Sequence, residues 1–162
     1  MSFLERILLL IYFPQFHSPI KSRFESFFAT ILKNENLLNH KINNSELIFP
    51  QKIARNEDKR TSIIIKGIPN DMPKSDVRNL LDKFGNINYL YLIKDPINLE
   101  QNSSIAFVNV INYKSIIPLF MNLRSLKFLK NGKIYNINIM YSTAQGKKQL
   151  IEYLKKNNFF KY

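Results

Sequence analysis

Two segments of the chain, residues 60–70 and 103–110, constrain its fold more than any other part of the sequence. Both show the alternation that is typical of a half-buried β-strand. The interval between them has room for one helix and one further strand, which is the order found in a βαββαβ unit. The sequence therefore predicts a ferredoxin-like α+β sandwich in which these two segments are the central strands.

The other elements of the sandwich follow from the spacing of apolar residues. The predicted strands are 61–68, 87–94, 105–110 and 134–141, and the predicted helices are 75–84, 113–123 and an extra C-terminal helix at 147–156. Right-handed crossovers fix the strand order as fourth, first, third, second, with the first two helices on one face of the sheet. Pro118 lies inside the second helix, where a proline is expected to produce a kink.

The charge of the chain favours a polyanionic partner. The 162 residues include 24 Lys and Arg against 12 Asp and Glu, which gives a net charge of +12. Long-range attraction of this sign is typical of proteins that bind nucleic acid. A second interpretation is also open, because abundant Asn, Ile and Lys are the mark of an AT-rich coding sequence, and part of the lysine excess then carries no functional meaning.

The residue types that most catalytic and metal sites require are scarce. The chain has no cysteine, and its two histidines, His17 and His40, lie far apart in sequence. Disulfides, thiolate chemistry and cysteine metal sites are excluded, and we expect no metal and no cofactor. We also find no paired carboxylates, catalytic triad or phosphate-binding loop, so we expect that the protein is not an enzyme.

The N-terminal third differs from the patterned region. Residues 53–162 are predicted to form one domain with its C-terminal helix, and residues 1–52 a helical or partly disordered extension. Within the extension, residues 20–38 can form an amphipathic helix, which either packs on the domain or stays exposed to bind a partner. Residues 34–58 are polar and rich in asparagine, and we interpret them as a linker.

The apolar run at residues 7–13 is far shorter than the ~20 residues that cross a bilayer. We therefore expect no membrane span and an intracellular protein of the nucleus or cytoplasm. A mitochondrial presequence stays open, because Arg6, Lys21 and Arg23 lie among serines and apolar residues.

The period of two assigns each strand residue to a face of the sheet. Residues such as Ile63, Ile65 and Val108 point to the helices, and their neighbours point to an outer face that is predicted to be exposed. Aromatic rings on such a face suit RNA, because a base stacked on a ring contributes roughly 1–3 kcal/mol. The predicted RNA contacts, from this face, the fourth strand and the C-terminal helix, are Ile64, Lys66, Tyr89, Tyr91, Ile105, Phe107, Asn109, Asn138, Lys147 and Lys148.

Motifs that flank the sheet point to a family. Residues 53–61 read Ile-Ala-Arg-Asn-Glu-Asp-Lys-Arg-Thr, residues 65–70 read Ile-Lys-Gly-Ile-Pro-Asn, and residues 145–151 read Gln-Gly-Lys-Lys-Gln-Leu-Ile. Together with Ser-Ile-Ile-Pro at 115–118, they resemble the atypical C-terminal RNA recognition motif of the Mei-two-like RNA-binding proteins. The resemblance covers residues 53–160.

This resemblance implies the same fold and a sheet face that binds RNA. Carried over by position, the first-strand contact is Ile64, where the family usually has methionine. The third-strand rings fall at Ile105 and Phe107, where the family usually has tyrosine and phenylalanine. Gly67 stands where the family has asparagine, and the helix after residue 145 is an integral part of the domain.

Two functions follow from these observations. The first is an RNA-binding protein that recognises single-stranded RNA on a four-stranded antiparallel sheet. The alternative is a protein-interaction module that uses the sheet face or the N-terminal helix within a ribonucleoprotein assembly. The alternative stays open because only Ala106, Phe107 and Val108 fit the consensus third-strand motif. An apolar face of this kind can equally be covered by the third helix or by another protein.

Overall fold

The computed structural model describes residues 46–94 and 103–161. These residues belong to one compact unit of the chain, Lys41–Tyr162. The predicted helix at 20–38 and nearly all of the predicted N-terminal extension lie outside the described residues.

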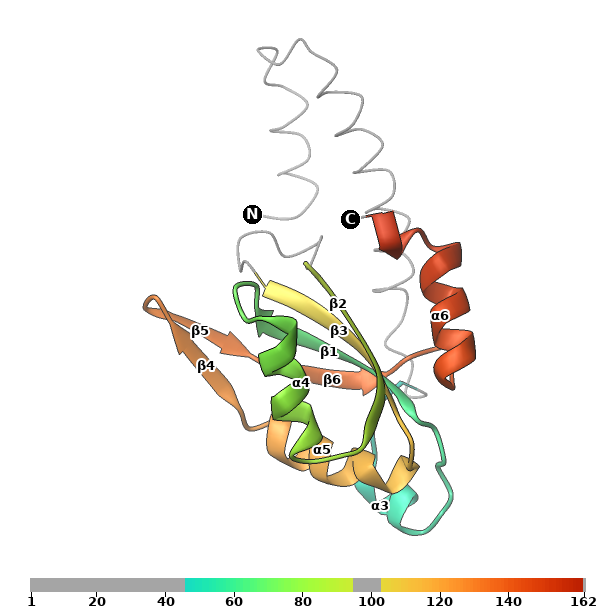
Figure 1. Cartoon of the computed structure of the whole chain (residues 1–162). Helices are drawn as coiled ribbons and strands as arrows, with labels where there is room; N and C mark the ends of the chain where they lie inside the picture. Colours follow the sequence, from blue (N-terminus) through green and yellow to red (C-terminus); the bar gives the residue numbers. More distant parts are fainter. Residues whose placement is uncertain (1–45, 95–102, 162) are drawn as a thin grey trace, which may run out of the picture. The chain divides into compact units, whose positions relative to one another are not determined.

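A four-stranded antiparallel sheet forms the centre of the domain (Figure 1). Its strands are β1 (Ser62–Pro69), β2 (Ile87–Lys94), β3 (Ser103–Val110) and β6 (Asn138–Tyr141). They lie in the order β2-β3-β1-β6. This order confirms the predicted arrangement of fourth, first, third and second strand, and it makes β1 and β3 the central pair.

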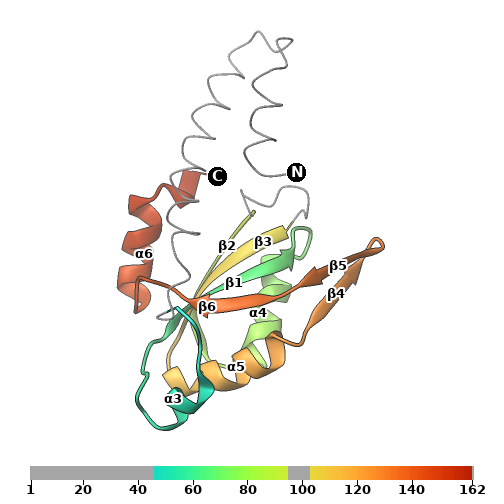
Figure 2. The same cartoon turned by 180° about the vertical axis from the view of Figure 1, so that it is seen from behind.

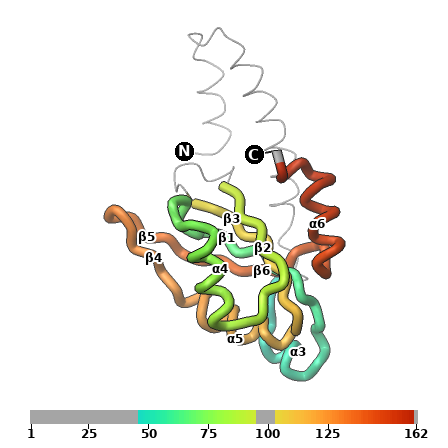
Figure 3. The backbone as a smooth tube through the Cα atoms, in the orientation of Figure 1, coloured from blue at the N-terminus to red at the C-terminus, as the bar shows by residue number. Residues whose placement is uncertain are grey.

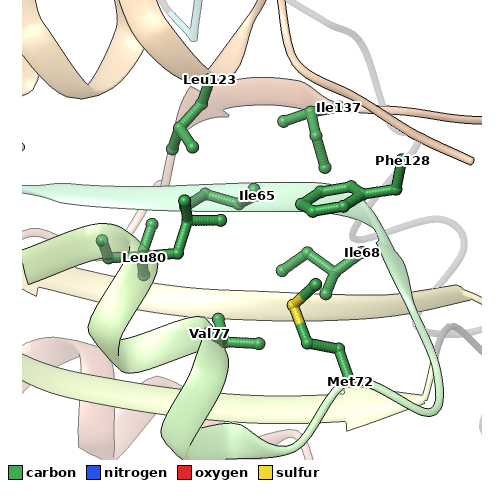
Figure 4. Close-up of a pocket in the computed structure, with 9 residues that line it drawn as sticks. Ile65, Ile68, Met72, Val77, Leu80, Leu123, Phe128 and Ile137 are labelled. Carbon is green, nitrogen blue, oxygen red and sulfur yellow. The ribbon is translucent and has the colours of Figure 1, made fainter. Parts of the chain in front are cut away.

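One face of the sheet is covered by two helices, α4 (Lys74–Asp82) and α5 (Ile116–Leu123), the second preceded by the short helix η2 (Tyr113–Ser115). Ile63, Ile65 and Val108 pack there against Leu81 and Leu119, as the strand period predicts. This core has a gap of about 10 Å³ that is lined only by apolar side chains. Figure 4 shows the residues around it. The gap has no polar partner for a bound molecule, so it is a packing defect and not a ligand site.

Pro118 does not disturb α5. The helix begins at Ile116, so Pro118 is its third residue. The first turn of a helix has no intrahelical partner for its N–H groups, and the missing N–H of proline therefore costs nothing. The predicted kink in a helix interior is wrong because the regular α-helix starts three residues later than predicted.

The predicted strand 134–141 is two strands. β5 (Lys133–Asn136) pairs with β4 (Lys127–Lys130) in a separate two-stranded sheet, and only β6 joins the main sheet. The turn of the β4–β5 hairpin has Asn131 and Gly132, both with positive φ. This is the residue pair and the backbone conformation that favour a tight hairpin turn. The hairpin projects beyond the sheet at the end away from the C-terminal helix (Figure 3).

Gly67 marks the point where the hairpin meets β1. Its φ is +84°, and a Cβ atom built on it would lie 2.0 Å from the carbonyl oxygen of Asn136. The pairing between β1 and β3 shifts register between Ile65 and Ile68, so Gly67 lies in a bulge. Only a residue without a side chain allows the β5 backbone to approach this closely.

The segment before β1 packs on the domain. Helix α3 (Pro50–Ala54) contacts α5, and Ile48 and Ile53 are buried in the core. The backbone N–H of Tyr141 in β6 donates to the carbonyl oxygen of Glu46 (2.8 Å). The interpretation of residues 34–58 as a linker is therefore wrong from Glu46 onward, because this part supplies core side chains.

The C-terminal helix α6 (Lys147–Lys156) has the predicted bounds. Figure 2 shows it apart from α4 and α5. Its apolar residues Leu150 and Leu154 are buried, and the helix contacts β3. A short helix, η3 (Phe159–Lys161), follows.

Candidate nucleic-acid interface

The outer face of the sheet carries the residues that the strand period assigns to it. The strand register places Tyr91 opposite Phe107, Phe107 opposite Ile64, and Ile64 opposite Met140. These four side chains form a row across the four strands of the main sheet. A second row runs through Tyr89, Asn109 and Ser62, since Asn109 is the partner of both other residues. The assignment of residues to the outer face is confirmed.

The predicted exposure of this face is wrong for four residues. Phe107 has no exposed surface, Ile105 also has none, and Ile64 and Asn109 are buried. A chain segment on this face contributes to the burial. The ring of Phe159, itself 3% exposed, packs on Phe107 with ring centroids 5.3 Å apart.

We call η3, with Phe159 and Phe160, the C-terminal strap. It engages the neighbouring strand as well. The hydroxyl of Tyr91 donates to the carbonyl oxygen of Phe159 (3.1 Å), and the ring of Phe160 meets that of Tyr91 edge-on at 4.7 Å. Tyr89 and Tyr91 are half-buried, and burial raises the pKa of both hydroxyls. Both phenols are therefore neutral hydrogen-bond donors at neutral pH.

Asn109 is held inside a hydrogen-bond network. Its Oδ1 accepts from the hydroxyls of Ser62 (2.7 Å) and Thr61 (2.9 Å), and its Nδ2 donates to Asn88 Oδ1 (2.8 Å). The sequence predicts an exposed amide that selects base edges. In the structure this amide is buried and saturated by neighbours in the fold, so its visible role is to join β1, β2 and β3.

The Gln-Gly motif before α6 is a second part of this network. Gln145 Oε1 accepts from the backbone N–H groups of Thr61 and Ser62 (both 2.9 Å). Its Nε2 donates to the carbonyl oxygens of Ser62 (2.9 Å) and Ser142 (2.7 Å), and the Gly146 N–H donates to the Ser62 hydroxyl (2.9 Å). This motif therefore fixes the start of α6 to the start of β1.

The segment that leads into β1, with Asp58 and Arg60, likewise stabilises the fold. Arg60 donates Nε to Asp58 Oδ1 (2.9 Å) and Nη2 to Oδ2 (2.7 Å), and its guanidinium lies 3.7 Å from the ring centroid of Tyr141. The hydrogen bond from Arg60 lowers the pKa of Asp58. Burial raises the pKa of Tyr141, which stays neutral beneath the cation. The lead-in thus links the start of β1 to the end of β6.

Polar groups lie at two other places. Lys66 and Asn138 are register partners on the outer face of β1 and β6, and Asn138 is exposed. Lys147 and Lys148 are exposed on α6. They lie near the Ser62 end of β1, because Gly146 is bonded to Ser62, and Lys66 lies four residues further along the strand. The predicted basic contacts therefore lie at two separate places, Lys66 in the middle of β1 and Lys147 and Lys148 beside its start.

The strap is not among the features predicted from the sequence, although Phe159 and Phe160 are an apolar pair within a polar and basic terminus. Large apolar side chains are mostly buried, so this pair is the sequence signal that predicts a contact between the terminus and the domain. Met140 was also missed, because the fourth strand was predicted without assigning its faces.

No group of three His, Asp or Glu side chains within the described residues could hold a metal ion. In the same part of the chain, no helix combines the length and apolar character needed to cross a membrane.

The βαββαβ order and the ring-bearing outer face define an RNA-recognition-type domain. The model of the RNA recognition motif 2 family matches residues 60–155, and the chain belongs to this family. The resemblance inferred from the flanking motifs is thereby confirmed.

The chain spans only a small part of the length of the curated relatives that it matches. The chain is 30% identical over 111 residues to Protein MEI2-like 1 of Arabidopsis thaliana, a match that covers 66% of this chain and 12% of that protein. It is 36% identical over 106 residues to Meiosis protein mei2 of Schizosaccharomyces pombe, covering 62% and 14%. Among solved structures, the RNA15 RRM matches 58% of this chain and 99% of its own, with 18% identity and a TM-score of 0.43.

Proposed function

We propose that this chain is a non-enzymatic protein that binds single-stranded RNA on the outer face of its sheet. The observation that carries the proposal is the position of Phe107. Its ring lies on a central strand of an RNA recognition motif 2 domain, next to the ring of Tyr91 on the neighbouring strand. Unpaired bases stack on rings in this position, and every base has a π face to offer.

The polar residues of the face supply the remaining contacts. Lys66 neutralises a phosphate, and the exposed amide of Asn138 beside it contacts a base edge or a sugar. Lys147 and Lys148 extend the basic surface near the Ser62 end of β1. The cellular compartment and any ribonucleoprotein subunits that bind the chain stay predictions from the sequence.

The test measures the affinity of the full chain for RNA by fluorescence anisotropy. The probes are a fluorescein-labelled pool of random single-stranded RNA and a duplex of the same length. We expect a preference for the single strand and an affinity that falls with salt. Lys66→Gln should lower the slope of log affinity against log salt by about 0.7, the value for one phosphate of a single strand that the protein no longer neutralises.

Lys74→Gln is the matched control. Lys74 is exposed at the start of α4, which covers the opposite face of the sheet, and the change in net charge is the same. An equal effect of both substitutions would contradict a site on the outer face. Phe107→Ala is unsuitable as the primary test, because the ring is buried and its loss would destabilise the fold.

A further inference from the structure

We infer that the C-terminal strap regulates RNA binding by occupying the stacking positions of the outer face. The inference rests on the proposed function, since it assigns the strap to the same surface. In this arrangement the ring of Phe159 takes the place of a base. RNA gains access to Phe107 only when the strap leaves.

Phe159 covers the ring of Phe107 on which a base would stack, with the two ring planes tilted by 52°. Its ring centroid lies 5.3 Å from that of Phe107, within the range of aromatic pairs, and Tyr153 of α6 stacks on it at 6.2 Å. Phe159 is therefore held between a ring of the sheet and a ring of the helix. The strap also contacts Tyr91, whose hydroxyl donates to the Phe159 carbonyl oxygen and whose ring meets the ring of Phe160.

The strap can move without α6. The helix is held independently, by Leu150 and Leu154 and by the hydrogen bonds of Gln145 and Gly146 at its start. Between helix and strap lies Asn158, with φ of 59°, a left-handed conformation that ends the helix and redirects the chain. The strap itself is a single turn of three residues. Rotation at this junction would uncover the rings and leave the domain intact.

Competition between strap and RNA has a quantitative consequence. The apparent dissociation constant equals the intrinsic constant divided by the fraction of molecules that are open. A strap closed in roughly nine molecules of ten weakens binding about tenfold. The contacts of the two phenylalanines are apolar apart from one hydrogen bond between uncharged groups. Substitution of either ring therefore leaves every charge of the chain in place.

The experiment uses the full chain with Phe159→Ala and, separately, Phe160→Ala, and the random single-stranded RNA pool as probe. Phe49→Ala is the matched control, because Phe49 is 39% exposed beside α3 and its loss removes the same ring elsewhere. We expect Phe159→Ala to bind about tenfold tighter than the parent, Phe160→Ala about threefold tighter, and Phe49→Ala equally. The slope of log affinity against log salt should be the same in all four proteins.

Circular dichroism melting shows whether each variant is folded. Phe160 is 42% exposed, so Phe160→Ala tests the strap even if Phe159→Ala unfolds the domain. Parent-like or weaker binding by the folded variants, with a parent that binds RNA, overturns the role of the strap and leaves the proposed function standing. Absence of binding by parent and folded variants alike overturns both.

Discussion

Phe107 and Asn109 lie on the outer face of the sheet, and both are buried. The alternation of side chains along a strand places both residues on the outer face, and the register confirms this. Phe159 of the strap packs on Phe107, and the Ser62 hydroxyl donates to Asn109, so both partners come from distant parts of the chain. Alternation is a local property of the backbone, whereas burial requires tertiary contacts that no local pattern contains.

Gly67 permits a sharp test at the scale of a single residue. Gly67→Ala should lower the free energy of unfolding by about 3 kcal/mol or more, because the new methyl group meets the Asn136 carbonyl oxygen and the positive φ disfavours an L-residue. Chemical denaturation measures this loss.

Gly132→Ala is the control, because Gly132 also has a positive φ but has no atom within 4 Å of its position for Cβ. Its loss should be about 1 kcal/mol, the conformational part alone. Equal losses for the two variants would show that the close approach of β5 is not a constraint.

Among the elements, predictability follows the strength of the periodic signal. Strand β2 and helix α6 have the predicted bounds, since each has an unbroken apolar pattern between clear breaks. The β4–β5 hairpin was missed because β4 has only four residues, two of them lysines, and its partner was read as part of β6. Short strands that pair only with each other leave little periodicity to detect.

Gln145 joins α6 to β1, so its replacement tests how much this connection stabilises the domain. In Gln145→Glu a carboxylate replaces the Nε2 donor and faces the carbonyl oxygens of Ser62 and Ser142. We expect a loss of about 2 kcal/mol in the free energy of unfolding, from the loss of both hydrogen bonds and from repulsion between the carboxylate and the two carbonyl oxygens. Thermal or urea unfolding measures it.

Gln149→Glu introduces the same charge four residues later, where the side chain is exposed. It should leave stability within about 0.5 kcal/mol of the parent. If both variants lose the same stability, the effect is one of charge on α6 and not of the connection to β1.

In the whole molecule, positive charge is concentrated near the C-terminus, in and after α6. The last 16 residues contain five lysines against one glutamate. Lys147, Lys148, Lys155 and Lys156 are exposed at the two ends of α6. Replacing these four with glutamine should weaken RNA binding and lower the salt slope by about 0.7 for each phosphate that is no longer neutralised, with base preference unchanged.

A second quadruple variant separates position from net charge. Lys52, Lys74, Lys83 and Lys114 are also exposed, on or beside α3, α4 and η2. Their replacement by glutamine removes the same charge, and we expect a parent-like slope from anisotropy titrations across salt. A parent-like result for the α6 variant would exclude the helix from the RNA site.

The hydrogen bond between Tyr141 and Glu46 bears on how the domain avoids self-association. β6 is the last strand of the main sheet, and an open strand edge is a template for pairing with another chain. The carbonyl of Glu46 already occupies one of the N–H groups on that edge, and Ile48 anchors the covering segment in the core. A shortened chain that starts after Glu46 would lose this cover and expose the edge to aggregation. A fragment of the domain that resists aggregation should therefore begin before residue 46.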